Sequence, residues 1–332
     1  MKLLYDYWYI ACQSKQLKAA PLARCLLNTH LVLFRGPDGT PGALEDRCAH
    51  RNLALSRGVC TDRGLQCCYH GWTYDVTGRC VLIPADSMES PEENIRIRAF
   101  EVREKQGFLW VYMGAGRPRT EPLDFPLYAA HRVRHWVMER VFEGDALQCA
   151  ENFLDVPHTI FVHKKLFRNE SRQQLQFEVT GGRDFVQAEF FDEQPFDTFL
   201  GRLLIPRNER MVHTDRFQLP CTTRVDYYFS EQRRFVVMSQ CTPISENRTR
   251  VFTYMVFRFD PIPRIIQWIY EPLSNRILDQ DVEIIGRQSA DMARFGGPDF
   301  RFQRADAIVK EIYQLAAGKY RPGKARRGAI WI

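Results

Sequence analysis

The stretches Cys48-Ala49-His50 and Cys67-Cys68-Tyr69-His70 decide the fold, and 16 residues separate them. Together they read C-x-H-x16-C-x2-H, so that each half carries one cysteine and one histidine. Each half lies between short apolar runs, a pattern that predicts loops at the tips of β-hairpins. Cysteine thiolates and neutral imidazoles are metal ligands. The sequence therefore predicts a metal centre held between two loops of a β domain.

The distribution of the ligands indicates which metal they hold. The alternative is a tetrahedral zinc site, but zinc sites usually pair their ligands as C-x2-C and H-x3-H. Two thiolates on one iron and two imidazoles on the other form the ligand set of a Rieske [2Fe–2S] centre. The mixed halves, followed by Gly71-Trp72, favour this centre. We predict that Cys48, His50, Cys67 and His70 bind the cluster.

At this motif the sequence resembles the Rieske family. Respiratory members carry two further cysteines, which form a disulfide, and the corresponding positions here are Leu53 and Tyr69. The resemblance therefore implies a cluster of the lower-potential oxygenase or ferredoxin type. Cys60 and Cys68 have no role in this interpretation, and we expect them to be buried free thiols.

The composition is that of an ordinary globular protein. The chain has 332 residues, 45% of them hydrophobic, with a net charge of +6. No run approaches the roughly 18 apolar residues of a spanning helix, and the N-terminus lacks the features of a signal peptide. Ten cysteines are too few for a secreted disulfide scaffold. We expect a cytoplasmic protein that binds neither membranes nor nucleic acids.

The last 14 residues are strongly basic. They contain five Lys or Arg residues and no acidic residue, namely Lys319, Arg321, Lys324, Arg326 and Arg327. We expect a solvated tail; the alternatives are docking patches for an acidic redox partner or for a neighbouring subunit.

The chain is long enough for a second domain. A Rieske ferredoxin would end near residue 115, whereas this chain continues for more than 200 residues. Residues 114–118 have the composition of a linker. We predict an α+β protein with an all-β Rieske [2Fe–2S] domain over residues 1–115 and a larger catalytic domain, with an antiparallel sheet and helices, over residues 116–332. Strands are expected at 31–34, 81–83, 108–113, 223–229 and 249–259, and helices at 272–294 and 303–317.

A second group of candidate ligands lies in Asn152-Phe153-Leu154-Asp155-Val156-Pro157-His158, and His163 follows five residues later. On a helix, Asn152, Asp155 and His158 would share one face because they are spaced by three. A regular helix would aim His163 elsewhere. Both histidines can face one metal only if the helix bends or ends between them, which Pro157 makes possible.

An iron site of two histidines and one carboxylate also needs an acid. The helix predicted around residues 276–288 carries one apolar stripe, formed by Ile277, Leu278, Val282 and Ile285. Asp281 falls within this stripe, whereas Asp279, Gln280 and Glu283 fall on the polar face. Because a buried carboxylate is costly unless it is paired or bound to a metal, we predict that Asp281 is the third ligand.

The pattern N-x2-D-x2-H-x4-H downstream of a Rieske motif is similar to the catalytic signature of Rieske non-haem iron oxygenases. The resemblance implies that His158, His163 and Asp281 bind mononuclear Fe(II), with positions left open for O₂. It also places Asn152 near the iron.

The resemblance gives Asp155 a role as well. In the family, the equivalent carboxylate links a Rieske histidine of one subunit to an iron-binding histidine of the next. Asp155 would then carry electrons from the partner subunit's His70 to His158 in a homotrimer. The alternative is that Asp155 orients His158.

These parts imply the terminal oxygenase component of a Rieske non-haem iron monooxygenase. A separate reductase or ferredoxin would supply electrons from NAD(P)H, because the chain has no G-x-G-x-x-G after a strand. The short chain is similar to the homotrimeric branch that includes vanillate and dicamba O-demethylases and the saxitoxin-pathway hydroxylases. Hydroxylation or oxidative dealkylation of a small, cyclic or aromatic substrate is therefore favoured over cis-dihydroxylation.

Two other functions remain open. A Rieske electron-transfer protein without oxygenase activity would hold the cluster but no mononuclear iron, and a zinc-binding interaction protein would be colourless. Residues 191–228 are rich in aromatic residues and arginines, and we expect them to contribute to the substrate pocket. Their arginines could each hold an acidic substrate or lie on a solvated face, and they include Arg202, Arg207, Arg210 and Arg216.

Overall fold

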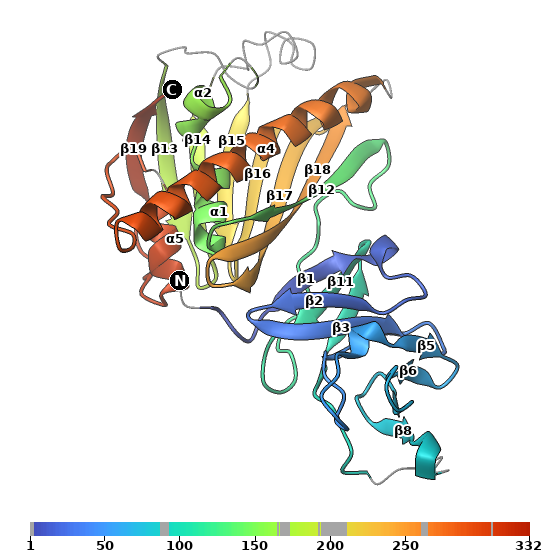
Figure 1. Ribbon diagram of the computed structural model, residues 1–332. Coiled ribbons are helices and arrows are strands. Elements are labelled where there is room, and N and C mark those ends of the chain that lie inside the picture. Colours follow the sequence, from blue (N-terminus) through green and yellow to red (C-terminus); the bar gives the residue numbers. More distant parts are fainter. Residues whose placement is uncertain are drawn as a thin grey trace. The chain divides into compact units, whose positions relative to one another are not determined.

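The computed structural model describes residues 3–86, 93–164, 166, 173–191, 193, 211–259, 265–306 and 308–332. The chain forms two compact units, Leu3–Asp124 and Phe125–Ile332, which Figure 1 colours along the sequence. The units divide between Asp124 and Phe125, whereas the sequence places the boundary at residue 115. Within the described ranges, no helix is long and apolar enough to cross a membrane.

In its described part, the N-terminal unit is built from three small antiparallel sheets. The first sheet has the order β1 (Trp8–Gln13), β11 (Phe108–Tyr112) and β10 (Val102–Lys105). The second has the order β2 (Leu22–Leu26), β3 (Thr29–Arg35), β4 (Pro41–Glu45) and β9 (Ala99–Phe100). The third has the order β5 (Val59–Thr61), β6 (Gly64–Gln66), β7 (Thr73–Tyr74) and β8 (Cys80–Leu82). Short 3₁₀ turns occupy Ser14–Gln16, Leu55–Arg57 and Pro84–Asp86.

Two hydrophobic clusters hold this unit together. The first contains Tyr9, Leu33 and Leu109 from the first two sheets. The second packs beneath the loops that carry the predicted cluster ligands, and it includes Leu65 and Tyr74. Burial of these side chains gives the loops a rigid base.

An eight-stranded antiparallel sheet dominates the described part of the C-terminal unit, with the order β12-β18-β17-β16-β15-β14-β13-β19. In chain order the strands are β12 (Val133–Phe142), β13 (Gln174–Gly181), β14 (Phe185–Phe191), β15 (Val212–Gln218), β16 (Thr222–Ser230), β17 (Arg233–Ser245), β18 (Arg248–Phe259) and β19 (Arg326–Trp331). Along β14 and β15, buried residues alternate with more exposed ones, as expected for strands with one face in a core. The predicted α+β architecture is confirmed.

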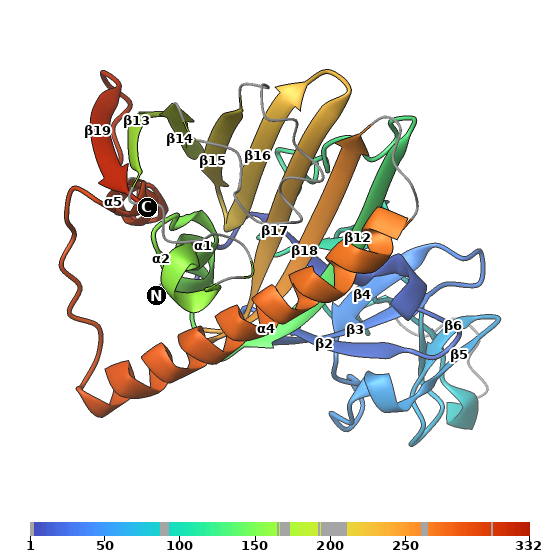
Figure 2. The same ribbon diagram turned by 90° about the horizontal axis from the view of Figure 1, so that it is seen from above.

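The helices of this unit cover one face of the sheet (Figure 2). They are α1 (Ala146–Leu154), α2 (His158–Val162), α4 (Ile265–Arg294) and α5 (Val309–Ala316). The predicted start of the long helix at residue 272 is wrong, because α4 continues through Pro272 from Ile265. Proline removes one helical hydrogen bond, and the contact of Tyr270 with Phe257 of β18, whose ring centroids are 5.4 Å apart, helps to offset this loss.

The basic C-terminal segment is not a free tail throughout. β19 pairs antiparallel with β13 at the edge of the sheet. Arg326 contacts Glu311 at 2.9 Å, and Arg327 contacts Glu178 at 2.5 Å. The expected solvated tail is therefore wrong for the residues of β19, which backbone pairing and two acidic partners hold in place.

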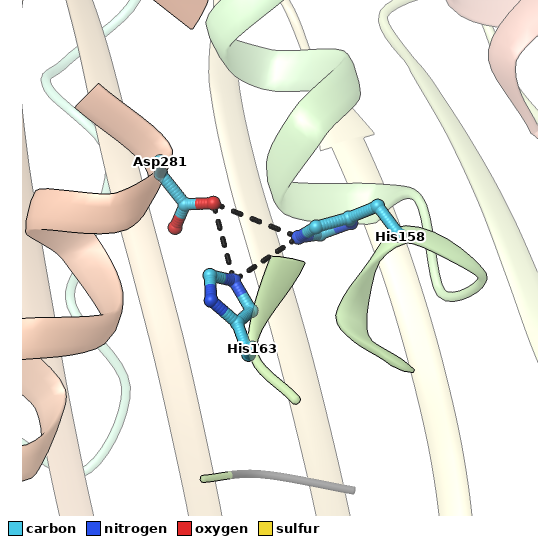
Figure 3. Close-up of side chains that lie close together, drawn as sticks. All are labelled: His158, His163 and Asp281. Carbon is cyan, nitrogen blue, oxygen red and sulfur yellow. Dashed lines mark hydrogen bonds and ion pairs between the residues drawn. The ribbon is translucent and has the colours of Figure 1, made fainter. Parts of the chain in front are cut away.

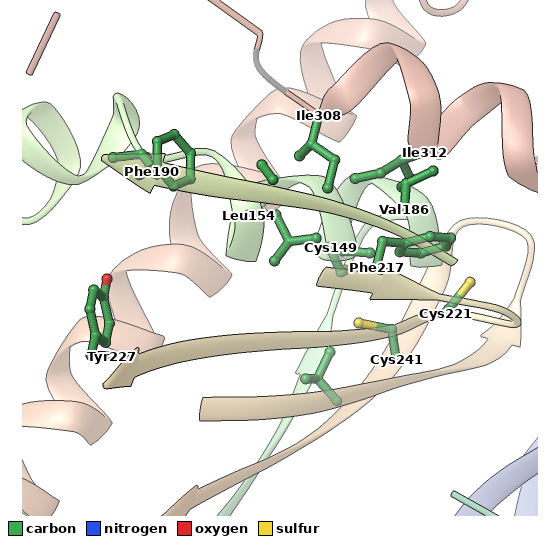
Figure 4. Close-up of a cluster of buried hydrophobic side chains, with 14 of the residues drawn as sticks. Cys149, Leu154, Val186, Phe190, Phe217, Cys221, Tyr227, Cys241, Ile308 and Ile312 are labelled. Carbon is green, nitrogen blue, oxygen red and sulfur yellow. The ribbon is translucent and has the colours of Figure 1, made fainter. Parts of the chain in front are cut away.

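The packing of α1 determines where the site residues lie. Figure 4 shows Cys149 and Leu154 of α1 among buried side chains of the sheet, including Phe217 and Cys241. Gly144 precedes the helix, and a Cβ there would lie 2.5 Å from Ile285 Cγ2 on α4. Only a glycine therefore allows this close approach of α1 to α4.

The N-terminus of α1 is fixed by a capping box. The Asp145 side chain accepts hydrogen bonds from the backbone of Leu147 and Gln148, and the Gln148 side chain accepts one from the backbone of Asp145. Such reciprocal bonds satisfy amide groups that a helix start leaves unpaired. Gln148 also donates to Gln288 of α4 at 3.2 Å, which links the two helices.

Candidate functional site

Two loops of the N-terminal unit carry the four predicted cluster ligands. Cys48 and His50 follow β4, and Cys67 and His70 lie in the hairpin loop between β6 and β7. The two imidazole ring centroids are 4.4 Å apart. Burial raises the pKa of Cys67, and the neighbouring Cys48 adds to the rise. The loops therefore place two thiols and two imidazoles close together.

One detail of the prediction is wrong. Only the second loop is the tip of a hairpin, because β4 and β5, which flank the first, belong to different sheets. In the second loop, Gly71 has a φ of +74°, and a Cβ there would lie 2.9 Å from Pro84 Cγ. A side chain at this position would strain the backbone and clash with the adjoining turn.

The surroundings of the four residues fit a metal cluster. His50 Nδ1 is buried and has no hydrogen-bond partner among the described residues; such an atom is costly to bury unless something binds it. Trp72 stacks on the His50 ring at 4.6 Å with an angle of 2° between the planes. The ring is thus held by packing while its buried nitrogen is left for a ligand bond.

Tyr74 is a residue that the sequence analysis did not single out. Its hydroxyl accepts a hydrogen bond from the Ala49 backbone at 3.2 Å and lies 3.3 Å from Cys48 Sγ. The hydroxyl hydrogen is then available to the sulfur. A hydrogen bond to a thiolate stabilises its charge, so Tyr74 suits a cysteine that binds iron.

The remaining cysteines of this region differ from expectation. None of the ten cysteines, all of which lie in the described ranges, forms a disulfide. Cys60 is half-buried, but Cys68 is exposed, so the expectation that Cys68 is buried is wrong. Its neighbour Cys67 points into the core, and the next residue of the loop consequently faces outward with Tyr69.

In the C-terminal unit, Figure 3 shows His158, His163 and Asp281 converging on one point. His163 Nε2 lies 3.2 Å from Asp281 Oδ1, and His158 Nε2 lies 3.6 Å from the same oxygen. The two Nε2 atoms are 3.2 Å apart. These three side chains could therefore hold one metal ion.

The two histidines lie at the two ends of one short helix. α1 ends at Leu154, and Asp155 follows it in an extended conformation with φ −89° and ψ 96°. His158 begins α2, and His163 comes directly after its last residue. The prediction that Asn152, Asp155 and His158 share a helix face is wrong, because α1 ends before Asp155. The expected end of a helix between the histidines is confirmed, because α2 ends at Val162 and His163 is no longer helical. Pro157 is not the cause of this end, since it precedes both histidines. Pro157 lacks an N–H group and so favours the start of a new helix over the continuation of α1.

The third side chain comes from α4, as predicted. Asp281 is buried, with 4% of its surface exposed, beside the buried Leu278 and Ile285. Asp279 instead forms an exposed ion pair with Arg140 at 2.7 Å. The apolar stripe therefore identifies the acid that reaches the histidines.

Neighbouring groups orient all three side chains. His158 Nδ1 donates to the backbone oxygen of Asp155, and His163 Nδ1 donates to Gln280 Oε1 at 2.9 Å. Both imidazoles consequently present Nε2 to the common point. Asn152 donates to Asp281 Oδ1 at 2.8 Å. Such bonds fix the tautomer and direction of metal ligands. The sequence analysis assigned Gln280 to the polar face and missed this role.

The electrostatics favour an ionised carboxylate beside basic imidazoles. Burial acts to raise the pKa of Asp281, but its interactions with His158 and His163 hold it below its ordinary value. Burial acts to lower the pKa of His158, but Asp281 and then Asp155 raise it. For Asp155 itself, burial dominates and raises the pKa. The group is thus complementary to a cation.

A cavity of about 190 Å³ lies beside these side chains. Its described walls come from α1, α2, α4 and strands β12, β16, β17 and β18, and they are mostly apolar. Asn152, His158, His163 and Asp281 all line it. A small molecule in this cavity would contact the metal site directly.

The four arginines that the sequence analysis named in residues 191–228 divide into two groups. Arg202, Arg207 and Arg210 lie outside the described residues. Arg216 stands on the sheet face opposite the cavity, because its neighbours His213 and Phe217 alternate to the cavity side. Its guanidinium lies 3.8 Å from the centre of the Phe185 ring. Arg216 therefore does not line the cavity.

Comparison with known proteins agrees with this division of the chain. Residues 7–100 match the Rieske [2Fe-2S] domain, and residues 142–312 match the vanillate O-demethylase oxygenase C-terminal domain. The oxygenase subunit of 3-chlorobenzoate-3,4-dioxygenase from Comamonas testosteroni is 35% identical over 169 residues, which are 48% of this chain and 38% of that protein. The oxygenase component of dicamba O-demethylase from Stenotrophomonas maltophilia is 31% identical over 191 residues, which are 57% of this chain and 56% of that protein.

The fold is shared with solved structures. Dicamba monooxygenase bound to 3,6-dichlorosalicylic acid superimposes with a TM-score of 0.80 at 23% identity, over 96% of this chain and 98% of that chain. The curated relatives, in contrast, are matched over only 38% and 56% of their lengths. The Rieske domain implies a [2Fe–2S] cluster, and the oxygenase domain implies a mononuclear iron. Because the oxygenase domain covers more than half of the residues and follows a Rieske domain, the chain belongs to the Rieske oxygenase family.

Proposed function

We propose that this chain is the terminal oxygenase component of a Rieske non-haem iron monooxygenase, which hydroxylates or oxidatively dealkylates a small cyclic or aromatic substrate. The observation that carries the proposal is the convergence of His158, His163 and Asp281 at the wall of an apolar cavity. Two imidazoles and one carboxylate hold ferrous iron in such oxygenases and leave positions open. The cavity offers space for a substrate next to those positions.

Within this proposal, the N-terminal loops hold the cluster. Cys48 and Cys67 would bind one iron, and His50 and His70 the other. The buried, unpartnered Nδ1 atom of His50 supports this assignment. When bound, the cluster supplies single electrons and the ferrous ion activates dioxygen.

The residues around the second group keep its ligands in position. Gln280 and the backbone of Asp155 hold the Nδ1–H groups of His163 and His158, so that both rings direct Nε2 inward. Asn152 holds Asp281 Oδ1, which limits rotation of the carboxylate. The apolar walls exclude bulk water from the side on which the substrate would lie.

Asp155 would act as the electron bridge between subunits of a homotrimer. Its Oδ2 atom lies 3.7 Å from His158 Nδ1, and its side chain is 32% exposed. One end of the carboxylate therefore approaches His158 while the rest is accessible to the partner subunit's His70. Its alternative role, orienting His158, is supported less well, because the Asp155 backbone oxygen already accepts the Nδ1 proton.

The electrons would come from NAD(P)H through a separate reductase or ferredoxin. Monooxygenation is favoured because the matching C-terminal domain is that of vanillate O-demethylase, and because dicamba O-demethylase is a relative. The similarity to a dioxygenase subunit keeps cis-dihydroxylation as the alternative reaction.

The test is to count iron and acid-labile sulfide in anaerobically purified protein and in the variant His158→Ala. We expect about three irons and two sulfides per chain in the wild type, following from the two ligand sets. His158→Ala should lose one iron and all substrate oxidation, while the cluster keeps its electron paramagnetic resonance spectrum. His131→Ala, which changes an exposed histidine of the same unit, is the control and should keep all three irons.

Other outcomes would identify other functions. Two irons and two sulfides in the wild type, unchanged after addition of Fe(II), would identify an electron-transfer protein. Zinc without sulfide would overturn both assignments. Loss of the cluster in His158→Ala would mean that the two metal groups are not separate.

A further inference from the structure

The four predicted cluster ligands differ in how far solvent reaches them. Cys48 and Cys67 are only 2% and 3% exposed. His50 is half-buried, and its Nδ1 atom is buried. His70, in contrast, is exposed. His70 is therefore the ligand whose surroundings water can change most easily.

Each imidazole packs against an aromatic ring of the second loop. Trp72 stacks on His50, with the centroids 4.6 Å apart. The ring of Tyr69 lies against His70, with the centroids 3.8 Å apart and an angle of 39° between the planes. Because the imidazoles are themselves 4.4 Å apart, the rings contact one another in the order Trp72, His50, His70 and Tyr69. The two ligands thus lie between two aromatic side chains.

The backbone of the loop fixes the position of Tyr69. The Cys67 amide donates to the Trp72 carbonyl at 2.9 Å, and the Gly71 amide donates to the Cys67 carbonyl at 3.1 Å. Gly71 adopts the left-handed conformation, which glycine tolerates and which turns the chain directly after His70. Tyr69 is therefore held at the tip of a closed loop, next to the ligand that it contacts.

The two aromatic residues differ in what else they contact. Trp72 packs against the hydrophobic cluster that contains Leu65 and Tyr74. Tyr69 belongs to neither of the two hydrophobic clusters described above, and 64% of its surface is exposed. The stability of the fold therefore depends little on Tyr69, whereas the surroundings of His70 depend on it directly.

Covering one side of His70 has an electrostatic consequence. With two thiolates and two neutral imidazoles as ligands, uptake of one electron converts one ferric ion to ferrous and changes the net charge of the cluster from zero to −1. Water stabilises such a charge more than an aromatic ring does. A ring that keeps water away from a ligand therefore disfavours the reduced state and lowers the reduction potential.

We propose that Tyr69 is a positioning residue, which holds the His70 ring and keeps the reduction potential of the cluster low by excluding water from one side of that ring. A lower potential gives the reduced cluster more driving force to pass its electron to the mononuclear iron. The inference rests on the proposed function, since it requires that His70 binds the cluster.

A redox titration of the anaerobically purified full chain at pH 7, followed by electron paramagnetic resonance of the reduced cluster, tests the proposal without relying on turnover. Tyr69→Ala removes the ring and should raise the potential, so that the ratio of reduced to oxidised cluster at the wild-type midpoint increases several-fold. Tyr69→Phe loses only the hydroxyl and should keep the wild-type potential and spectrum.

Tyr5 provides a matched control. It is another exposed tyrosine of the same unit, with 51% of its surface exposed, and its hydroxyl donates to the Leu27 carbonyl at 3.4 Å. Tyr5→Ala should leave the potential unchanged. Tyr69→Asn, which also lacks a ring, repeats the test in case Tyr69→Ala does not fold.

The outcomes separate this inference from the proposed function. An unchanged or lower potential in Tyr69→Ala, or an equal shift in Tyr69→Phe, would overturn the inference. Loss of the cluster from both variants without a ring would also overturn it, because Tyr69 would then be required for assembly and not for the potential. In each case the full iron and sulfide counts and substrate oxidation by the wild type would still support an oxygenase. Conversely, a wild type that binds no [2Fe–2S] cluster would refute the proposed function itself.

Discussion

The two ligand groups of this molecule are assembled in different ways. In the N-terminal unit, four ligands come from two loops that 16 residues separate, and each loop holds its cysteine and histidine at a short, fixed spacing. In the C-terminal unit, His158 begins the five-residue helix α2 and His163 directly follows it, whereas Asp281 belongs to α4, far along the chain. The first group is a local motif, and the second exists only when two helices that are distant in the sequence, α2 and α4, pack close together. Distant substitutions should therefore disturb the second group more readily than the first.

The largest effects come from removing one ligand of each group. Cys48→Ala should abolish the cluster and its visible spectrum, because one iron loses half of its protein ligands, while the mononuclear iron stays bound. Asp281→Ala should instead release the mononuclear iron and leave the cluster intact, since it removes the only carboxylate of the described group. Iron and sulfide counts with electron paramagnetic resonance would measure both. If either variant lost both metal groups, the contrast between local and assembled sites would be wrong.

The next largest effect is expected at a buried ion trio in the C-terminal unit, in which His213 lies 2.6 Å from Glu193 and 3.0 Å from Asp215. His213→Gln should destabilise this unit by about 3–5 kcal/mol, because it removes the buried cation that contacts both Glu193 and Asp215. In urea, the variant should release the mononuclear iron well before the cluster's visible spectrum fades. Simultaneous loss of both would show that the N-terminal unit depends on the same packing.

The same imidazole predicts a dependence on pH. The two carboxylates raise the pKa of His213 from 6.5 to about 9 against the opposing effect of burial. The resulting stabilisation is complete below pH 6.5 and is lost as the pH rises through 9. The urea midpoint of the wild type, followed by circular dichroism, should fall across this interval, whereas that of His213→Gln should change less. A midpoint that rises from pH 6.5 to 9 would contradict the assignment.

Variants of Gln280 test one hydrogen bond of the group formed by His158, His163 and Asp281. Gln280→Leu removes the acceptor of His163 Nδ1 and should weaken binding of the mononuclear iron by about 10- to 100-fold. Gln280→Glu keeps an acceptor and should retain most of the affinity. Asp279→Ala, at the exposed neighbouring position, is the control. Competition with a ferrous chelator measures all three, and equal affinities of the leucine variant and the wild type would remove Gln280 from the site.

The smallest effect is expected at Glu151 of α1, which accepts a hydrogen bond from Tyr313 of α5 at 2.7 Å. Burial raises the pKa of this carboxyl from 4.5 to about 7. The folded state therefore holds the proton more tightly, so stability falls as the pH rises from 4.5 to 7 and stays lower above that range. Glu151→Gln should stabilise the protein at pH 8 by on the order of 1–3 kcal/mol and have little effect at pH 4.5. Urea unfolding at both values measures this, and a variant less stable at pH 8 would refute it.

The first ligand group is easier to predict from the sequence than the second, because its residues lie close together in the chain. The cluster ligands and the α+β architecture follow from local spacing and periodicity. Asp281 could also be found, because a carboxylate on an apolar stripe is costly without a partner. Gln280 could not, because an amide on a polar face is ordinary and its partner His163 is 117 residues away.

Two further features show where the sequence reasoning stops. Pro157 predicts that the helix is interrupted, but not whether the interruption comes before or after the proline, since proline can end one helix or begin the next. The rings of Tyr227, Phe235 and Phe257 stack on one another. This stack depends on the register of strands β16, β17 and β18. Register is fixed by pairing across the whole sheet, so no single strand pattern predicts which rings become neighbours.

The hydrogen bond from His158 Nδ1 to the main chain of Asp155 has a genetic consequence. No codon change at position 155, other than one that moves the backbone, can remove the acceptor that sets the His158 tautomer. The orientation of the His158 ring therefore does not depend on which side chain occupies position 155. If Asp155 is the bridge proposed above, Asp155→Asn should slow electron transfer between subunits while the iron remains in place. If iron were lost together with electron transfer, the carboxylate itself would have to be the element that orients the ring.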